Sequence, residues 1–159
     1  MSHVPQGYTD VTPWIMSADT NRLFEFMAGA FDADEVARVL LADGSTGHAE
    51  ARIGDAIIMA FDAPKGVQPV PVFLRLFVED ARQAFARALQ AGATDITKPT
   101  LLAFGDRVGR IRDPLGNVWW LQQHIEDVSP EELARRWTDP KWIEPMVYVQ
   151  QSLARALGQ

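Results

Sequence analysis

The sequence predicts an α+β fold made of two βαβββ units followed by a helical extension. Apolar residues alternate in strand fashion in several short segments and follow helical spacing in others. The order of these segments occurs twice, with a spacing of about 60 residues, which indicates an internal duplication. Matching positions in the two halves are Asp19 and Asp80, Phe24 and Phe85, and the turns Gly54-Asp55 and Gly116-Asn117.

The first unit is predicted to span residues 1–64. Residues 11–16 alternate as a strand, and Asp19 or Thr20 then caps a helix. Three further strands are expected at residues 36–41, 47–53 and 56–61, the last two joined as a hairpin. The apolar stripe of the helix contains Leu23, Phe24, Met27 and Phe31.

The second unit is predicted to span residues 65–128, after a linker rich in Pro and Gly. A strand at residues 72–78 precedes a helix that starts near Ala81 and ends at Gly92. Strands are then expected at residues 96–102, 106–112 and 118–123. The last two flank Asp113-Pro114-Leu115-Gly116-Asn117, where Pro fixes φ and Gly permits positive φ, as a tight turn requires.

Residues 129–159 form the predicted helical extension. Ser129 caps a short helix that has Pro130 in its first turn and runs through Arg136. A second helix starts at 138–140, with Pro145 tolerated near its first turns. Because this helix carries an apolar stripe, we expect it to pack on its own domain or on a partner subunit. The stripe contains Ile143, Met146, Val147, Leu153 and Leu157.

Composition limits the classes of function. The chain has 159 residues, of which 47% are hydrophobic, and 15 basic against 21 acidic residues. We expect no nucleic-acid partner because no basic stripe is present. We expect no membrane association because no apolar run reaches the roughly 18 residues of a membrane span. The N-terminal residues lack the pattern of a signal peptide, and cysteine is absent. These features favour a cytoplasmic protein.

Two segments are typical of one known family. These are HAEARIGD at residues 48–55 and GDRVGRIRDPLGNVWW at residues 105–120. They resemble the glyoxalase/bleomycin-resistance/extradiol-dioxygenase superfamily, which has the vicinal oxygen chelate fold, and the resemblance covers roughly residues 8–126. It implies that the two units join as one curved mixed sheet, a half-barrel cup. It also implies a homodimer.

The resemblance gives positions for a metal site. In metal-dependent relatives, His, Glu or Gln side chains of the first and last strand of each unit hold a divalent metal. Carried over, these positions fall on Thr12, on Ile58 or Met59, on Phe73 and on Trp120. Since none of these side chains is a good ligand for such a metal, we expect no metal and no other cofactor.

Apolar and aromatic side chains replace the ligands, so the leading hypothesis is a binding protein. The resemblance to members that bind flat aromatic antibiotics implies a metal-free protein that sequesters a hydrophobic or aromatic small molecule. Aromatic faces offer a large contact area for such a ligand. Filling of a core is the alternative role for these aromatics. The candidate ligand-binding residues are Trp14, His48, Glu50, Met59, Phe73, Phe104 and Trp120.

Two other functions stay open. His48 and Glu50 lie on one strand face, where they would serve a displaced metal site or acid–base chemistry of a lyase, isomerase or dioxygenase. Alternatively, the protein is a structural or regulatory dimer whose cup is filled. A charged cluster beside the second hairpin predicts an ion-pair network or a clamp for a ligand carboxylate or phosphate. It consists of Asp106, Arg107, Arg110 and Arg112, whereas His3 and His124 are expected at the surface.

Overall fold

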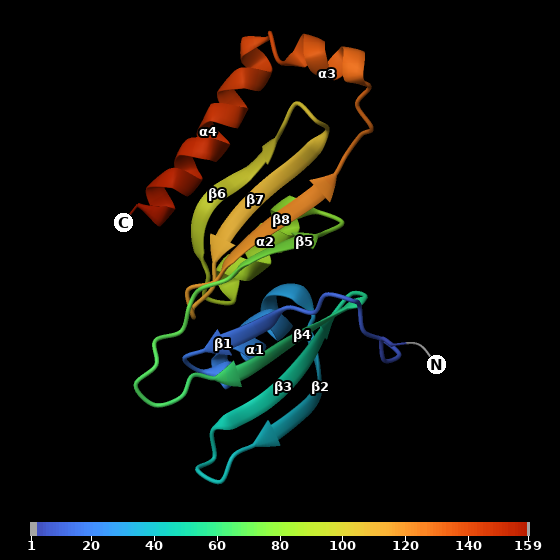
Figure 1. Cartoon of the computed structure of the whole chain (residues 1–159). Coiled ribbons are helices and arrows are strands. Elements are labelled where there is room, and N and C mark those ends of the chain that lie inside the picture. Colours follow the sequence, from blue (N-terminus) through green and yellow to red (C-terminus); the bar gives the residue numbers. More distant parts are fainter. Residues whose placement is uncertain (1–2, 159) are drawn as a thin grey trace.

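The computed structural model describes residues 3–158, which form two βαβββ units followed by two helices (Figure 1). This confirms the predicted α+β fold class. The first unit contains β1 (Trp14–Ser17), α1 (Thr20–Phe31), β2 (Asp34–Leu40), β3 (Thr46–Ile53) and β4 (Ala56–Asp62). The second contains β5 (Phe73–Phe77), α2 (Ala81–Gln90), β6 (Thr94–Leu101), β7 (Asp106–Arg112) and β8 (Val118–His124). The chain continues with α3 (Pro130–Arg136) and α4 (Pro140–Leu157).

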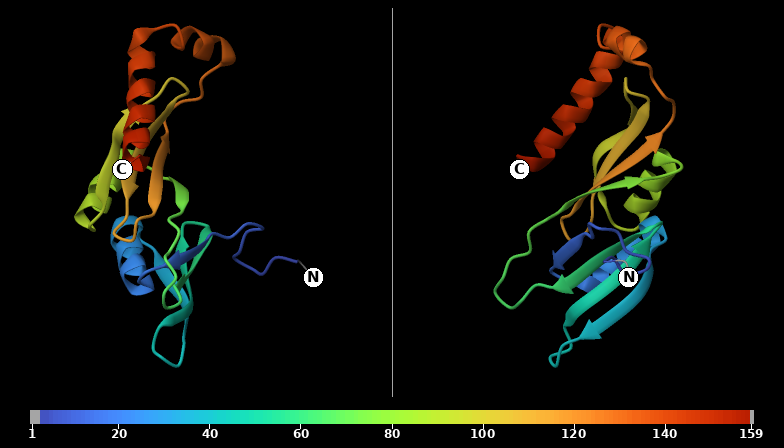
Figure 2. Two further views of the ribbon diagram at one scale, coloured as in Figure 1. Left: turned by 60° about the vertical axis from the view of Figure 1, so that its left-hand side comes forward. Right: turned by 45° about the vertical axis from the view of Figure 1, so that its right-hand side comes forward.

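Each unit contributes one mixed four-stranded sheet. The strand orders are β1-β4-β3-β2 and β5-β8-β7-β6, with the first pair parallel and the others antiparallel in both sheets. The two units lie end to end, with α1 and α2 next to each other where they meet (Figures 1 and 2). Each sheet therefore has one face covered by its own helix and one opposite face, here called the open face.

The two equivalent aspartates begin the two helices. The Asp19 carboxylate accepts a hydrogen bond from the backbone N–H of Arg22 at 3.0 Å. The Asp80 carboxylate accepts from the backbone N–H groups of Arg82 and Gln83 at 2.8 and 3.1 Å. Such capping satisfies N–H groups that have no acceptor within the helix. The repeated aspartates of the sequence thus mark the same structural position in both units.

One hydrophobic core joins the helix faces of both sheets. From the first unit it includes Ile15 and Met27, and from the second it includes Phe85, Trp119 and Leu121, all of them buried. The rings of Phe31 at the end of α1 and Trp119 on β8 lie 4.9 Å apart between their centroids. The two units therefore share their core across the contact between α1 and α2.

The turn between β7 and β8 is organised by Asp113, whose side chain is buried. Its carboxylate accepts hydrogen bonds from the N–H groups of Leu115 and Asn117, at 2.8 and 3.0 Å. It also accepts from the Asn117 side-chain amide at 2.8 Å and from the indole N–H of Trp119 at 3.0 Å. Gly116 has φ of 99°, a conformation that favours glycine. The turn signature is thus a hydrogen-bonded structure built around one carboxylate.

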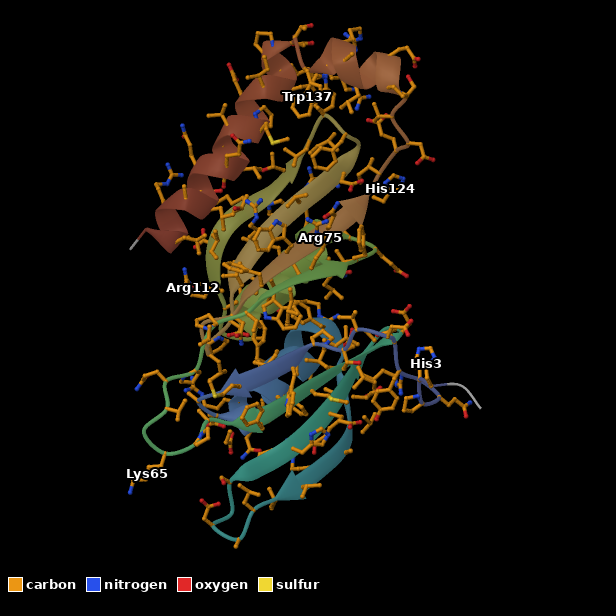
Figure 3. The ribbon with its side chains drawn as sticks, viewed as in Figure 1. His3, Lys65, Arg75, Arg112, His124 and Trp137 are labelled. Atoms are coloured by element: carbon orange, nitrogen blue, oxygen red, sulfur yellow. The ribbon has the colours of Figure 1, made fainter. Side chains whose placement is uncertain are left out.

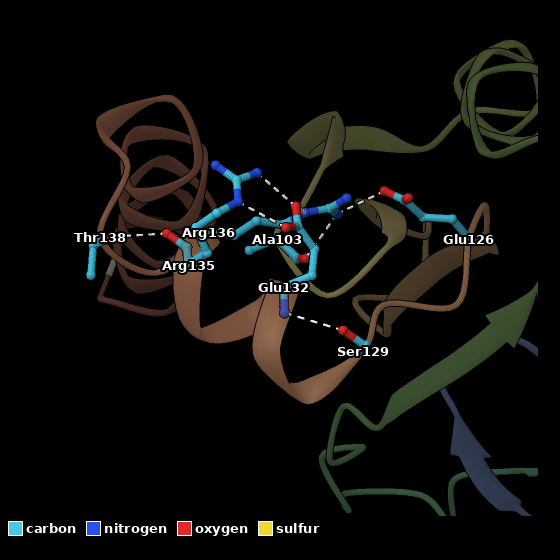
Figure 4. A network of polar contacts seen from close by, with 7 residues as sticks. All are labelled: Ala103, Glu126, Ser129, Glu132, Arg135, Arg136 and Thr138. Atoms are coloured by element: carbon cyan, nitrogen blue, oxygen red, sulfur yellow. Dashed lines mark hydrogen bonds and ion pairs between the residues drawn. The ribbon is translucent and has the colours of Figure 1, made fainter.

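The helical extension folds back onto the second unit. Arg136 of α3 donates to the Ala103 carbonyl oxygen at 3.1 Å and pairs with Glu126 at 2.7 Å and Glu132 at 2.9 Å (Figure 4). Hydrogen bonds from Arg135, and then from Arg136, lower the pKa of Glu132 to about 2. From this junction α4 runs back alongside β6 (Figure 1).

The predicted apolar face of α4 is wrong in part. Ile143, Val147 and Leu157 are exposed, whereas Val149 and Ser152 are the buried residues of this helix. Polar contacts set its rotation, because the Ser152 hydroxyl lies 2.7 Å from the hydroxyl of Thr97 on β6. Pro145 lies inside the helix and not in its first turn. Within residues 3–158, no helix is long and apolar enough to cross a membrane.

Candidate functional site

The open face of the first sheet carries a row of three predicted ligand-binding residues. Strand register places Trp14 beside Met59, and Met59 beside Glu50. His48 lies on the same face, with its Nε2 atom 2.8 Å from Glu50 Oε1. The N-terminal segment reaches this face, where the Tyr8 hydroxyl donates a hydrogen bond to Glu50 Oε2.

These contacts favour the ionised form of Glu50. The hydrogen bond from Tyr8, and after it the contact with His48, hold the pKa of Glu50 below its usual value. The same hydrogen bond raises the pKa of Tyr8. Glu50 therefore stays ionised at neutral pH, with both carboxylate oxygens engaged. A pocket of about 470 Å³ lies here, lined by Tyr8, Thr12, Glu50, Met59 and residues of the N-terminal segment.

The residues at the family's metal positions do not fit a metal. The sequence left open whether Ile58 or Met59 occupies the last-strand position of the first unit. Ile58 is buried in the core, whereas Met59 faces the open side, so we take Met59 for this position. The four positions are then Thr12, Met59, Phe73 and Trp120, which offer one hydroxyl and one thioether. Over the described part of the chain, no group of three or more His, Cys, Asp or Glu side chains is placed to hold a metal ion. His48 and Glu50 supply only two donors.

The open face of the second sheet is covered in part by α4. Arg110 and Arg112 of β7 donate hydrogen bonds to carbonyl oxygens of α4, those of Val149 at 2.8 Å and Ala156 at 2.7 Å. The backbone N–H of Lys98 donates to the Tyr148 hydroxyl at 3.0 Å. These bonds hold α4 on the face opposite to that of α2.

A pocket of about 330 Å³ lies between this open face and α4, and is called here the α4 pocket. Ligand pockets for small molecules commonly start near this size and are mostly apolar. Phe104 and Trp120, two of the predicted ligand-binding residues, line it. The other lining residues are Arg75, Leu102, Val108, Arg110, Gln122, Met146, Val149 and Gln150.

Trp120 occupies the centre of a row across three strands. Register places Arg75 of β5 on one side of it and Arg110 of β7 on the other. The guanidinium carbon of Arg110 lies 4.6 Å from the centroid of the Trp120 ring, a cation–π contact. Phe73 meets the same ring edge-on, with centroids 5.6 Å apart. The row combines aromatic surface with positive charge.

Arg110 is a buried cation with an incomplete set of partners. Its side chain belongs to a residue that is only 7% exposed, and its Nε atom has no hydrogen-bond partner. Burial, and then the like charge of Arg75, lower the pKa of Arg110. Arg75 lies on the same sheet as Arg110 (Figure 3). Over residues 3–158, no ion pair joins Arg75 or Arg110 to a carboxylate.

The structure divides the predicted site residues between two places. Trp14, His48, Glu50 and Met59 lie on the first sheet, and Phe73, Phe104 and Trp120 belong to the second unit, so a single chain does not bring them into one pocket. Phe73 is exposed beside the α4 pocket. The seven residues thus fall into two separate groups, one in each unit.

The charged cluster beside the second hairpin is not an ion-pair network among its own members. Asp106 accepts hydrogen bonds from Gln122 and from His124 Nδ1, the latter at 2.8 Å, while Arg110 and Arg112 hold α4. The candidate ligand-binding residues taken from the sequence did not include Tyr8, Arg75, Met146 or Val149, which line the two pockets. The alternation of β5 places Arg75 on the face of Phe73, which was the available signal for it.

Comparisons with known proteins agree with this fold. The model of the Glyoxalase/Bleomycin resistance protein/Dioxygenase superfamily matches residues 8–121. An uncharacterised protein of Mycobacterium bovis is 34% identical over 134 residues, a match that covers 77% of this chain and 88% of the relative. An uncharacterised protein of Mycobacterium tuberculosis has the same identity, with 79% of the relative covered.

Solved structures share the fold. TioX from Micromonospora sp. ML1 matches with a TM-score of 0.62 and 22% identity, covering 74% of this chain and 99% of TioX. Protein PA1353 from Pseudomonas aeruginosa matches with a TM-score of 0.63 and 16% identity, covering 74% of this chain and 99% of PA1353. At these identities the likeness concerns the fold alone. With the family model matched over most of its length, the chain belongs to the glyoxalase/bleomycin resistance protein/dioxygenase superfamily.

Proposed function

We propose that this protein binds a hydrophobic or aromatic small molecule in the α4 pocket and needs no metal to do so. The observation that carries the proposal is the cavity of about 330 Å³ between the second sheet and α4, with Phe104 and Trp120 in its lining. An aromatic ligand gains contact area and preferred ring geometry against such side chains. A flat aromatic antibiotic is one ligand of this class, so sequestration is the biological role we propose.

Because the predicted residues of the first sheet lie apart from the α4 pocket, we propose that a homodimer completes the binding surface. Trp14 and Phe73 are 62% and 56% exposed, although each is a large aromatic side chain on an open face. A second copy that covers these faces would remove apolar surface from water. In this proposal His48, Glu50 and Met59 of one copy face the α4 pocket of the other, with His48 or Glu50 as a polar contact.

Replacement of Trp120 tests the binding site. The neutral aromatic probe 2-naphthamide is titrated calorimetrically into the wild type and into Trp120→Ala, and aromatic antibiotics are screened by native mass spectrometry. We expect the variant to bind the probe at least about tenfold more weakly, since a lost ring contact of about 1.4 kcal/mol corresponds to that factor.

The matched control is Trp137→Ala, because Trp137 is 42% exposed and does not line the α4 pocket. This control should keep the wild-type affinity. Circular dichroism and the thermal midpoint establish that both variants are folded. Unchanged affinity in a folded Trp120→Ala variant would remove the pocket assignment.

An enzyme is the second candidate, favoured by the hydrogen-bonded group of Tyr8, Glu50 and His48 in its own pocket. Such a group suits acid–base chemistry. We rank it second because an ionised Glu50 with both oxygens engaged is a weak base. Stoichiometric retention of a divalent metal that is lost in His48→Ala would favour this candidate instead.

A further inference from the structure

Arg110 of the α4 pocket is a buried arginine without a carboxylate partner, unlike Arg136, the other buried arginine of the described chain. Arg38, Arg87 and Arg136 each pair with a carboxylate, at distances of 2.7, 2.6 and 2.7 Å. Arg75 and Arg110 have no such partner within the described residues, although the chain carries more acidic than basic side chains. Two like charges on one sheet face, one of them buried, raise the free energy of the empty pocket.

The hydrogen bonds of Arg110 leave part of its guanidinium group free. Nη1 donates to the Thr97 hydroxyl at 3.2 Å and to the Val149 carbonyl oxygen at 2.8 Å. Nε is without a partner, and no hydrogen bond of Nη2 occurs within the described chain. The planar guanidinium group can donate to both oxygens of one carboxylate. Nη2 is therefore a free donor that suits a carboxylate acceptor.

We infer that the ligand of the α4 pocket is an aromatic carboxylate, whose ring lies against Trp120 and Phe104 and whose carboxylate is held by Arg75 and Arg110. This inference rests on the proposed function and adds the chemical class of the ligand. Strand register supports it, because Arg75 and Arg110 flank Trp120 in one row. A single ligand thus satisfies the aromatic surface and both positive charges.

A matched pair of probes tests the inference. 2-Naphthoate and 2-naphthamide share one ring system and differ in charge, and their affinities are measured by calorimetric titration at low salt. We expect 2-naphthoate to bind about tenfold more tightly, as charge-assisted hydrogen bonds predict. The comparison is stringent because the formal net charge of −6 repels anions in general.

Arg75→Gln is the diagnostic variant, since Arg75 is exposed and makes none of the hydrogen bonds that hold α4. We expect it to weaken 2-naphthoate binding about fivefold and 2-naphthamide binding by less than about twofold, so that the preference for 2-naphthoate falls. Arg22→Gln on α1 is the control, because it removes the same charge from an exposed position outside the α4 pocket. It should leave the preference for 2-naphthoate intact.

The outcomes separate this inference from the proposed function. Equal affinity for the two probes, or equal losses in Arg75→Gln and Arg22→Gln, would overturn the aromatic carboxylate but keep a binding pocket. Absence of binding by both probes would overturn the proposed function and the inference with it.

Discussion

At the scale of single residues, Asp113 shows how one side chain fixes a turn. Four N–H donors from three residues converge on its carboxylate, and the residue is only 4% exposed. One of these donors is the indole of Trp119, whose ring belongs to the shared core. Asp113 therefore connects the turn geometry to the position of the neighbouring Trp120 in the α4 pocket.

We expect Asp113→Ala to lower the free energy of unfolding by about 3 kcal/mol, because it strands buried donors. The loss is smaller than four separate penalties, since a loosened turn lets some donors reach water. Chemical denaturation monitored by tryptophan fluorescence measures it. The control is Asp55→Ala in the corresponding turn of the first unit, where the side chain is exposed and the cost should stay within about 0.5 kcal/mol. Equal costs at both turns would contradict the role of Asp113.

At the scale of elements, α4 determines whether the second sheet has a pocket. It buries Val149 against Leu102 and Val108, and polar contacts from Arg110, Arg112 and Thr97 fix its position. Met146, Val149 and Gln150 of this helix line the α4 pocket. The extension outside the duplicated units thus supplies one wall of the proposed binding site.

Val149→Ala tests this role of α4. We expect it to destabilise the protein by about 1–2 kcal/mol through lost burial, and to weaken binding of 2-naphthamide. Val147→Ala makes the same change on the same helix, but Val147 is 42% exposed, so it should alter neither quantity. Thermal unfolding of both variants measures the stability, and calorimetric titration measures their affinity for 2-naphthamide. A stability loss in Val147→Ala alone would place the contact face of α4 elsewhere.

Elements were predictable where local chemistry determines them. The caps at Asp19 and Asp80, the turn at 113–117 and the strand alternation depend on neighbours in the sequence, and the structure has them. The face of α4 was not predictable, because its apolar residues occupy two sides and distant polar partners on β6 and β7 select one. The same holds for the site: sequence identified Trp120 as a candidate, but only the fold brings Val149 and Arg75 to it.

At the scale of the whole molecule, the two open faces leave apolar surface unpaired. Trp14, Phe73 and Phe77 are 62%, 56% and 65% exposed, and Val39 on β2 is 58% exposed. Apolar patches of this kind on a folded chain commonly mark an interaction surface. A second copy related by a two-fold axis would cover both faces at once. In such a dimer the first open face of each copy lies against the second open face of the other.

Phe77→Glu tests the proposed homodimer. A charged side chain at this open-face position would have to lose its hydration in the interface, so we expect the dimer to dissociate at least tenfold more readily. Sedimentation velocity over a concentration series measures the change. Val147→Glu on the outer side of α4 is the control and should leave the association unchanged. If Val147→Glu dissociates the dimer and Phe77→Glu does not, the copies associate through α4 and the two groups of predicted site residues do not meet. A wild-type protein that stays monomeric at all concentrations would restrict binding to the α4 pocket of a single chain.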